Sequence, residues 1–192
     1  MLMYQSIIEQ FRKFVNIDEN EIKSIIKNIK PIKLKNKEIL LKEGQICKSN
    51  YFVDKGCLRI YFINDKGSEQ ITQFALENWW LADYYSFIEQ KPSAYYIQAI
   101  EKTDVLALDF NMQDELFSLV PQLERYFRII AQKAIAASQI RSKLLYELSK
   151  EDFYLHFSSS FPKFVQRVPQ YMIASYLGLS PEYLSEIKAK NK

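Results

Sequence analysis

The sequence is poor in the residues from which thiol and metal chemistry is built. It contains two cysteines and one histidine in 192 residues. Cys47 and Cys57 are too few for a disulfide scaffold, an iron–sulfur cluster or a cysteine-type zinc site. His156 has no plausible metal ligand within a few residues, so we interpret it as an ordinary helix residue. We therefore predict no enzyme, no metal and no cofactor, although acid–base chemistry by carboxylates stays open.

Long apolar runs are also absent. No run approaches the roughly 18 residues that a membrane-spanning helix needs, so no membrane partner is predicted. The first charged side chain comes after eight residues and no small-residue cleavage site follows, so the N-terminal stretch is unlike a signal peptide. Apolar residues make up 48% of the chain and the net charge is only +3, which excludes disorder throughout. We expect a cytoplasmic protein with one large domain or two small ones.

Charge is divided unevenly along the chain. Residues 1–116 hold 15 Lys and Arg against 17 Asp and Glu, whereas residues 117–192 hold 11 against 6. A basic rear half is typical of a surface that faces nucleic acid or a membrane. It is equally compatible with an ordinary solvated surface, so charge alone does not decide the partner.

The first thirty residues have helical periodicity. Apolar residues recur at helical spacing, first at Ile7, Ile8, Phe11, Phe14 and Val15, then at Ile22, Ile25, Ile26 and Ile29. Asp18 and Glu21 between these groups predict a capping box that begins the second helix. Pro31 is expected to end that helix.

Glycine is scarce, and three of the four glycines mark a region of period-two patterning. Gly44, Gly56 and Gly67 are separated by short apolar runs, which is typical of a β-sandwich or barrel. Gly67 is expected to have a positive φ in a turn. The strand-like runs are residues 57–63, 70–76, 95–100 and 105–110, and residues 79–93 are predicted to form a loop with a short helix.

Residues 121–149 predict one long helix with a seven-residue apolar repeat. A helix of that length would extend ~43 Å, more than one small domain covers, so pairing with a second helix is favoured over packing within its own domain. Arg141 is the exception in the repeat. The stripe that we assign to dimerisation consists of Leu123, Phe127, Ile130, Ala134, Ala137 and Leu144.

The tail predicts two short helices joined by a tight turn. After a helix over residues 150–158 and a polar turn at residues 158–160, an amphipathic segment is interrupted by Gly178, and Ser180 caps the next helix. This is a helix-turn-helix pattern. Its core is expected to contain Ile173, Ala174, Tyr176, Leu177, Leu184 and Ile187.

With these motifs in order, the sequence resembles the Crp–Fnr family of bacterial transcription regulators over nearly its whole length. The motifs that carry the resemblance are Lys42–Gly44, Tyr51–Phe62, Ala99–Leu108, Pro121–Leu123 and Gln166–Ser185. The resemblance implies an α+β fold, in which an N-terminal double-stranded β-roll of the jelly-roll type carries flanking helices. A long dimerisation helix and a C-terminal helix-turn-helix domain follow. We place the domains at residues 1–118, 119–149 and 150–192.

The nucleotide pocket departs from that family pattern. Cyclic-nucleotide-binding members have Gly-Glu at the start and Arg-Ser/Thr-Ala at the end of a phosphate cassette. An ungapped comparison places Ala82-Asp83 and Ser93-Ala94-Tyr95 there. Ser93 cannot pair with a phosphodiester as arginine does, and Asp83 would repel it, so we predict that cAMP and cGMP do not bind in the usual way. Candidate liners for another effector are Arg59, Asp83, Tyr84, Ser93, Ser138 and Gln139. Alternatively, aromatic side chains simply fill the pocket.

The second helix of the tail is the candidate for reading DNA bases. The residues that we assign to DNA binding are Ser180, Pro181, Glu182, Ser185, Lys188 and Lys190. Glu182 matches a glutamate that contacts cytosine in many family members. A carboxylate can accept a hydrogen bond from the cytosine amino group. Family members often have arginines at Pro181 and Glu186, so the usual guanine readers are missing here. Lys192 is a further phosphate candidate, and the wing hairpin that usually follows is expected to be absent.

We therefore predict a homodimeric regulator that binds double-stranded DNA and has a degenerate nucleotide pocket with an unidentified small-molecule effector. The first alternative is a relic that senses a ligand or a protein but no longer binds specific DNA. The second is a cupin-type enzyme, because cupins share the jelly-roll architecture. Cupin metal sites need clustered histidines, which the β region of this sequence lacks.

Overall fold

A computed structural model describes residues 2–191, which form two compact units. The N-terminal unit runs to Phe62 and resumes over Gln73–Ile130. The C-terminal unit holds Ile63–Thr72 and the chain from Ala131 onward. This division differs from the predicted boundaries, because it falls inside the long helix and assigns a short internal segment to the C-terminal unit.

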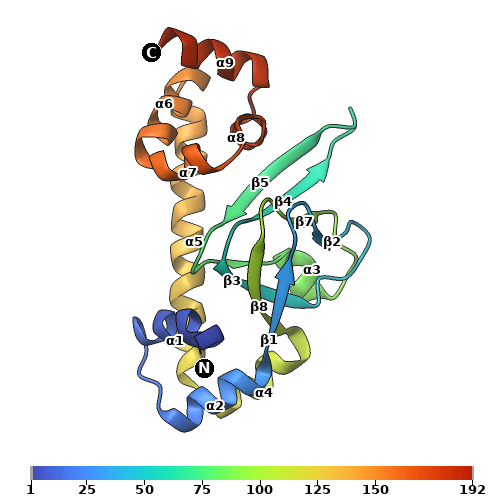
Figure 1. Cartoon of the computed structure of the whole chain (residues 1–192), viewed down its shortest axis with the longest axis vertical. Coiled ribbons are helices and arrows are strands. Elements are labelled where there is room, and N and C mark those ends of the chain that lie inside the picture. Colours follow the sequence, from blue (N-terminus) through green and yellow to red (C-terminus); the bar gives the residue numbers. More distant parts are fainter. Residues whose placement is uncertain (1, 192) are drawn as a thin grey trace. The chain divides into compact units, whose positions relative to one another are not determined.

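The order of elements confirms the α+β fold class (Figure 1). A 3₁₀ turn, Leu2–Tyr4, precedes all other elements. The strands are β1 Ile29–Leu34, β2 Ile39–Leu41, β3 Ser49–Lys55, β4 Leu58–Ile63, β5 Glu69–Ala75, β6 Trp80–Leu81, β7 Tyr96–Ala99 and β8 Thr103–Asp109. The helices are α1 Gln5–Arg12, α2 Glu19–Asn28, α3 Tyr84–Glu89, α4 Phe110–Leu119, α5 Gln122–Glu147, α6 Lys150–Ser160, α7 Pro162–Arg167, α8 Gln170–Leu177 and α9 Pro181–Lys190.

The strands form two four-stranded sheets, with the orders β1-β8-β3-β6 and β2-β7-β4-β5. The four predicted strands appear as β4, β5, β7 and β8. Side chains alternate between the two faces of each strand. Tyr51 and Val53 of β3 and Leu58 and Ile60 of β4 belong to the buried core between the sheets. The turn at Gly67 has φ +75°, as predicted.

The region around Pro31 differs from the prediction. The capping box of α2 forms as expected, with the Asp18 carboxylate accepting from the Glu21 N–H at 2.9 Å. However, α2 ends at Asn28, and Ile29 and Pro31 belong to β1. Because β1 is an edge strand, the N–H that Pro31 lacks is not needed by a second neighbouring strand. The helix thus ends three residues before Pro31 and without Ile29, which the prediction had placed on its apolar face, and a strand follows at once.

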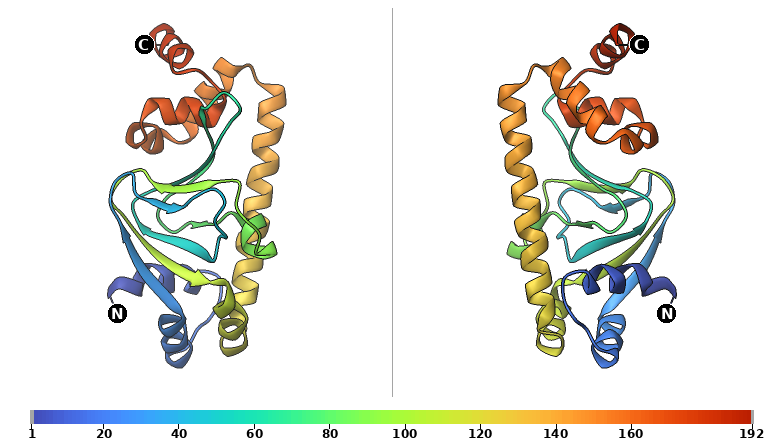
Figure 2. Two further views of the ribbon diagram at one scale, coloured as in Figure 1. Left: turned by 90° about the vertical axis from the view of Figure 1, so that its right-hand side faces the viewer. Right: turned by 90° about the vertical axis from the view of Figure 1, so that its left-hand side faces the viewer.

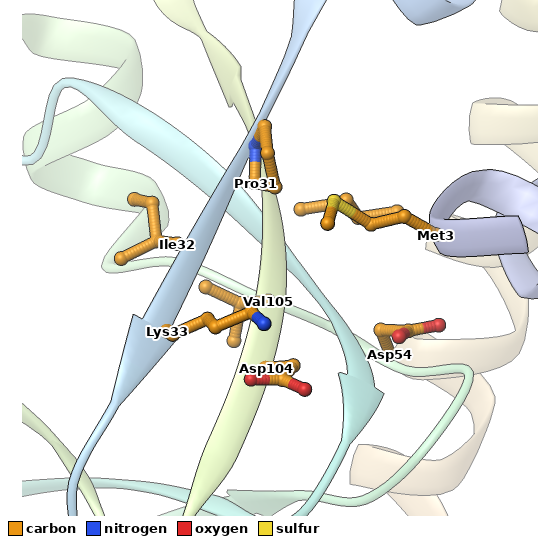
Figure 3. A pocket seen from close by; sticks show the side chains of 8 residues that line it. Met3, Pro31, Ile32, Lys33, Asp54, Asp104 and Val105 are labelled. Carbon is orange, nitrogen blue, oxygen red and sulfur yellow. The ribbon is translucent and has the colours of Figure 1, made fainter. Parts of the chain in front are cut away.

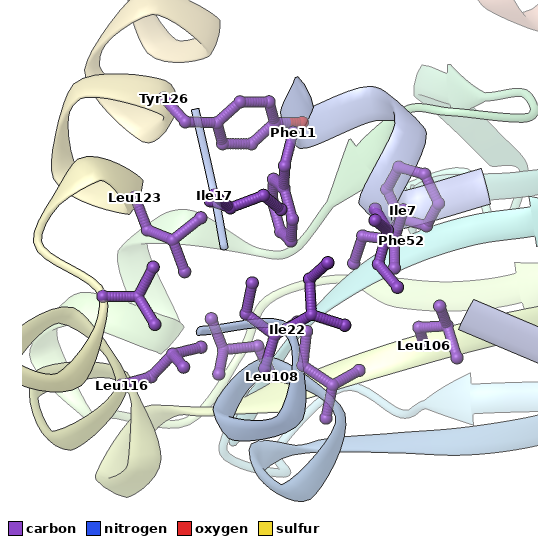
Figure 4. Close-up of a cluster of buried hydrophobic side chains, with 14 of the residues drawn as sticks. Ile7, Phe11, Ile17, Ile22, Phe52, Leu106, Leu108, Leu116, Leu123 and Tyr126 are labelled. Atoms are coloured by element: carbon purple, nitrogen blue, oxygen red, sulfur yellow. The ribbon is translucent and has the colours of Figure 1, made fainter. Parts of the chain in front are cut away.

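A second core lies on the other face of the first sheet. Helices α1, α2 and α4 gather at one end of the β-roll (Figure 2). Their apolar side chains meet Phe52, Leu106 and Leu108 of the sheet, together with Leu123 and Tyr126 of α5 (Figure 4). The start of the long helix is therefore anchored in the N-terminal unit.

Aromatic contacts define the centre of this helical core. The rings of Phe11 and Tyr126 meet edge to face, with centroids 4.6 Å apart. The Trp80 indole donates a hydrogen bond to the Tyr126 hydroxyl at 3.0 Å. Burial raises the pKa of Tyr126 to about 12. The Tyr126 hydroxyl therefore stays protonated at neutral pH and serves as the acceptor that the buried Trp80 N–H needs.

Tyr126→Phe is expected to lower the free energy of unfolding by about 1–3 kcal/mol at neutral pH, because the Trp80 N–H loses its acceptor. The folded pKa of about 12 lies above the unfolded value of roughly 10. The contribution of the hydroxyl is therefore complete below the unfolded pKa and is lost as pH rises towards the folded pKa. Urea titrations at neutral pH and near pH 11 should show that the variant unfolds with a lower free energy than the unmodified chain. The difference between the two should be smaller at the higher pH. Tyr146→Phe, at a side chain that is 93% exposed, is the control and should change neither value.

The C-terminal unit is built mainly from α6 to α9. The predicted core residues Ile173, Ala174, Leu177, Leu184 and Ile187 are buried, whereas Tyr176 is only half-buried. The serines 158–160 belong to the end of α6 rather than to a turn. Gly178 ends α8 with φ +70°, and Ser180 caps α9. Among residues 2–191, no helix is long and apolar enough to cross a membrane.

Candidate functional sites

Helix α9 presents one buried and one exposed face. The Ser180 hydroxyl accepts from the Tyr183 N–H at 3.1 Å, and Pro181 occupies the first turn, where its missing N–H is not needed. Leu184 and Ile187 are buried against the rest of the unit. This packing turns the opposite face of the helix to solvent.

The six predicted DNA-binding residues all lie on α9 or at its cap. Ser180, Pro181, Glu182, Ser185 and Lys190 are exposed, and Lys188 is half-buried. The Ser185 hydroxyl donates to the Pro181 carbonyl at 2.9 Å. Glu186 is exposed as well, and Lys192 lies outside the described residues. The structure therefore collects these side chains on one short helix.

A groove beside α9 adds a residue that sequence reasoning missed. It has a volume of about 220 Å³ and is lined by Gln170, Ser185, Lys188 and Ala189. Gln170 is the first residue of α8, so the groove joins the N-terminal end of one helix to a lysine of the next. Both features attract an anion such as a backbone phosphate. The sequence feature that could have indicated Gln170 is its position directly after Pro169, where a helix can begin.

The predicted dimerisation stripe divides between the two units. Leu123 is fully buried in the helical core, and Phe127 and Ile130 pack against that core. Leu123 is therefore not available to a partner, and assigning it to the dimer surface was wrong. Ala134 and Ala137 are exposed and Leu144 is half-buried. The large apolar side chains that α5 exposes are Ile135, Ile140, Leu145 and Tyr146.

Two of the predicted pocket residues are bonded to each other. The Ser93 hydroxyl donates to the Asp83 carboxylate at 2.6 Å, and both residues are at least 95% buried. The same carboxylate caps α3 by accepting from the Ser86 N–H at 3.3 Å. Ser93 is further fixed because its main chain bonds Gly44 and Gln45. At the cassette positions, a buried carboxylate and a hydroxyl thus satisfy one another.

Arg59 lies on a different face from the inter-sheet core. It alternates with Leu58 and Ile60, which belong to that core. Its guanidinium donates to the side-chain carboxamide oxygen of Gln98 at 2.9 and 2.6 Å, directly across the β4–β7 register. It also lies 4.1 Å from the centre of the Tyr61 ring. Arg59 therefore does not point into the interior of the roll, where we expected a ligand.

The other predicted pocket residues are more exposed. Tyr84 is 47% exposed, and its hydroxyl accepts from the Asn50 amide at 3.3 Å. Ser138 and Gln139 are exposed on the part of α5 that belongs to the C-terminal unit. Among the six candidates, Asp83 and Ser93 are thus joined by a hydrogen bond.

A separate hollow of about 270 Å³ lies on the N-terminal unit (Figure 3). It is bordered by Met3, Pro31, Ile32, Lys33, Asp54, Asp104, Val105 and Leu106. None of the six predicted pocket residues borders it. Asp54 accepts a hydrogen bond from Ser6, whereas one buried oxygen of Asp104 has no partner in the described part of the chain. The hollow is therefore polar on one side and apolar on the other.

The comparisons with known proteins agree with this architecture. Residues 31–118 match the cyclic nucleotide-binding domain model. The transcriptional activator protein FnrA of Stutzerimonas stutzeri is 30% identical over 181 residues, covering 88% of this chain and 72% of that protein. The transcriptional activator protein Anr of Pseudomonas aeruginosa is 28% identical over the same shares.

Solved structures share the fold. The c-di-GMP-responsive global regulator CLP of Xanthomonas campestris has a TM-score of 0.74 at 16% identity, covering 90% of this chain and 91% of that one. FixK2 of Bradyrhizobium japonicum has a TM-score of 0.68 at 16% identity, covering 84% and 83%.

The chain has the architecture of a β-roll followed by a long helix and a helix-turn-helix pair, and the transcriptional activators to which it is similar over most of its length define a class of regulators. Within that class, the chain belongs to the Crp–Fnr family of transcription regulators.

Proposed function

We propose that this chain is a dimeric, DNA-binding transcription regulator whose β-roll does not respond to cAMP. The observation that carries the proposal is the helix pair α8–α9, with Ser180, Glu182 and Ser185 exposed at the start of the second helix. In helix-turn-helix proteins, that end of the second helix reads base edges in the major groove. The names of the relatives, which are transcriptional activators, support the same function.

Dimerisation is supported by the exposed apolar side chains of α5. Ile135, Ile140 and Leu145 are 49–61% exposed along the second half of that helix. Large apolar side chains exposed on a long helix favour burial against a partner, which we take to be a second copy of this chain. Two copies of α9 would then address half-sites about 10 bp apart, or a multiple of that spacing, in a palindromic operator.

The test is selection of bound fragments from a sheared library of the source genome by the full chain at ~150 mM salt, which suppresses purely electrostatic binding. Enrichment of a palindromic site is the expected result. A flat affinity for all fragments in every effector condition tried would contradict the proposal. That result would instead favour the alternative of a ligand- or partner-sensing relic. The exposed Pro181 and Glu186 of α9, which stand where family members often have arginines, support this alternative.

The pocket supports a specific prediction about cyclic nucleotides. The bonded pair Asp83 and Ser93 places a carboxylate where a cyclic nucleotide would need a cation for its phosphate. We expect isothermal titration with cAMP or cGMP at micromolar concentrations to give no saturable heat. The fold of the sample is checked by circular dichroism before and after the titration. Saturable binding at micromolar affinity or tighter would contradict the prediction.

A further inference from the structure

The hollow of about 270 Å³ on the N-terminal unit lies on the helix-covered face of the first sheet. Leu106 of β8 pairs with Phe52 of β3, and both side chains belong to the helical core. Because side chains alternate along a strand, Asp104, two residues before Leu106, points to this same face. Lys33 of β1 is opposite Asp104 in the register. Met3 reaches the hollow from the N-terminal turn (Figure 3).

The polar side of the hollow holds two carboxylates without a cation. The Oδ1 atom of Asp104 is buried and has no hydrogen-bond partner among residues 2–191. Asp54, on the neighbouring strand β3, accepts from the Ser6 hydroxyl. Within the described chain, no ion pair joins Lys33 or another cation to either carboxylate. A buried carboxylate oxygen that lacks a donor is costly, so this side of the hollow is suited to a ligand that donates hydrogen bonds.

The other side of the hollow is apolar, which narrows the chemistry of that ligand. Met3, Pro31 and Leu106 offer no oxygen to a metal ion, whereas a hard cation prefers oxygen ligands on all sides. No group of three acidic, cysteine or histidine side chains among residues 2–191 could hold a metal. An anion would be repelled by the carboxylates. The volume of about 270 Å³ is just below the range of pockets for drug-sized ligands, which favours a smaller molecule.

We propose that this hollow binds a small organic ammonium ion, a primary amine with a short apolar chain. The ammonium group donates to Asp104 and Asp54, and the chain packs against Met3 and Pro31. At neutral pH such an amine is protonated, because its pKa is close to the value of roughly 10.4 for a lysine side chain. The exposed ammonium group of Lys33 repels the ligand and weakens its binding. The site is separate from the Asp83–Ser93 pair, and the proposal does not depend on DNA binding.

The first arm of the test is a nuclear magnetic resonance titration of the full, ¹⁵N-labelled chain with n-pentylammonium chloride. We expect saturable shifts of the Met3 and Asp104 amides, with a dissociation constant on the order of 1 mM for a ligand this small. Pentan-1-ol has the same chain without the charge and should bind at least about tenfold more weakly. Magnesium chloride, compared with sodium chloride at equal ionic strength, should not displace the amine. Absence of saturable shifts, equal binding of the alcohol, or displacement by magnesium would overturn the proposal.

The second arm changes the charge of the hollow. Asp104→Asn should weaken n-pentylammonium binding by at least about tenfold, because a charge-assisted hydrogen bond is lost. Asp114→Asn, at an exposed carboxylate of α4, is the matched control and should leave the dissociation constant unchanged.

Lys33→Met should tighten binding by about threefold, because a repelling surface charge is removed. Lys33 is exposed, so this variant tests the charge balance without altering a buried side chain. The dispersion of each amide spectrum shows that the variant is folded. Unchanged affinity in Asp104→Asn, an equal loss in Asp114→Asn, or no gain in Lys33→Met would show that the hollow is not an ammonium site.

Discussion

Replacing Gly56 with alanine is expected to lower the free energy of unfolding by about 2–5 kcal/mol. Gly56 has φ +100°, a conformation that side chains with a Cβ rarely adopt. A Cβ there would meet the Thr103 hydroxyl at 2.5 Å, and the Lys102 carbonyl and Thr103 Cα at 2.8 Å. Two of these atoms are main chain at the start of β8, so they cannot swing aside. Strain and overpacking therefore add together.

Gly44→Ala is the matched control for this prediction. Gly44 also has a positive φ, +82°, but nothing lies within 4 Å of the position of its Cβ. Its substitution should lower the free energy of unfolding only by the strain of placing a Cβ at a positive φ, roughly 1–2 kcal/mol. Urea unfolding of both variants, followed by circular dichroism, compares the two losses. Equal losses would mean that the close approach of Gly56 to β8 is not as the structure has it.

Local patterning predicted most of the fold. The capping box at Asp18 and the strands around Gly56 and Gly67 depend on neighbours in the sequence, and they form where expected. The strand β1 was missed because its pairing with β8 joins residues 69 to 79 positions apart. A proline in its middle also resembles a helix end more than a strand. Only the position of β1 at a sheet edge, a tertiary property, makes Pro31 acceptable there.

The candidate sites were predicted unequally for the same reason. The α8–Gly178–α9 pair is local, so its caps and core could be derived from spacing. The contact between Asp83 and Ser93 was not predicted, and the face on which Arg59 lies was mistaken because it depends on strand register with Gln98. For Arg141, the sequence showed that the residue breaks an apolar repeat. It could not show the Thr72 carbonyl of β5 to which the guanidinium donates.

On a selected operator, Glu182→Ala is expected to remove about 1–3 kcal/mol of discrimination at one base pair, while changing affinity for unrelated DNA little. Glu182 is exposed in the first turn of α9, where a carboxylate can accept from a cytosine amino group. A base reader loses selectivity when it is truncated. The measurement is fluorescence anisotropy against the operator and its single-base variants.

Lys188→Ala should act differently, because its side chain lines the groove with Gln170, where a phosphate is expected. Affinity should fall for all sequences, and the slope of log affinity against log salt should shrink by about 1. Glu186→Ala, on the same helix, should change the affinity in the opposite direction. Removing an exposed carboxylate near phosphates should strengthen binding to every sequence. Three substitutions within seven residues thus give three separable signatures. If all three leave both specificity and salt slope unchanged, α9 does not face DNA, and the assignment of the recognition helix is wrong.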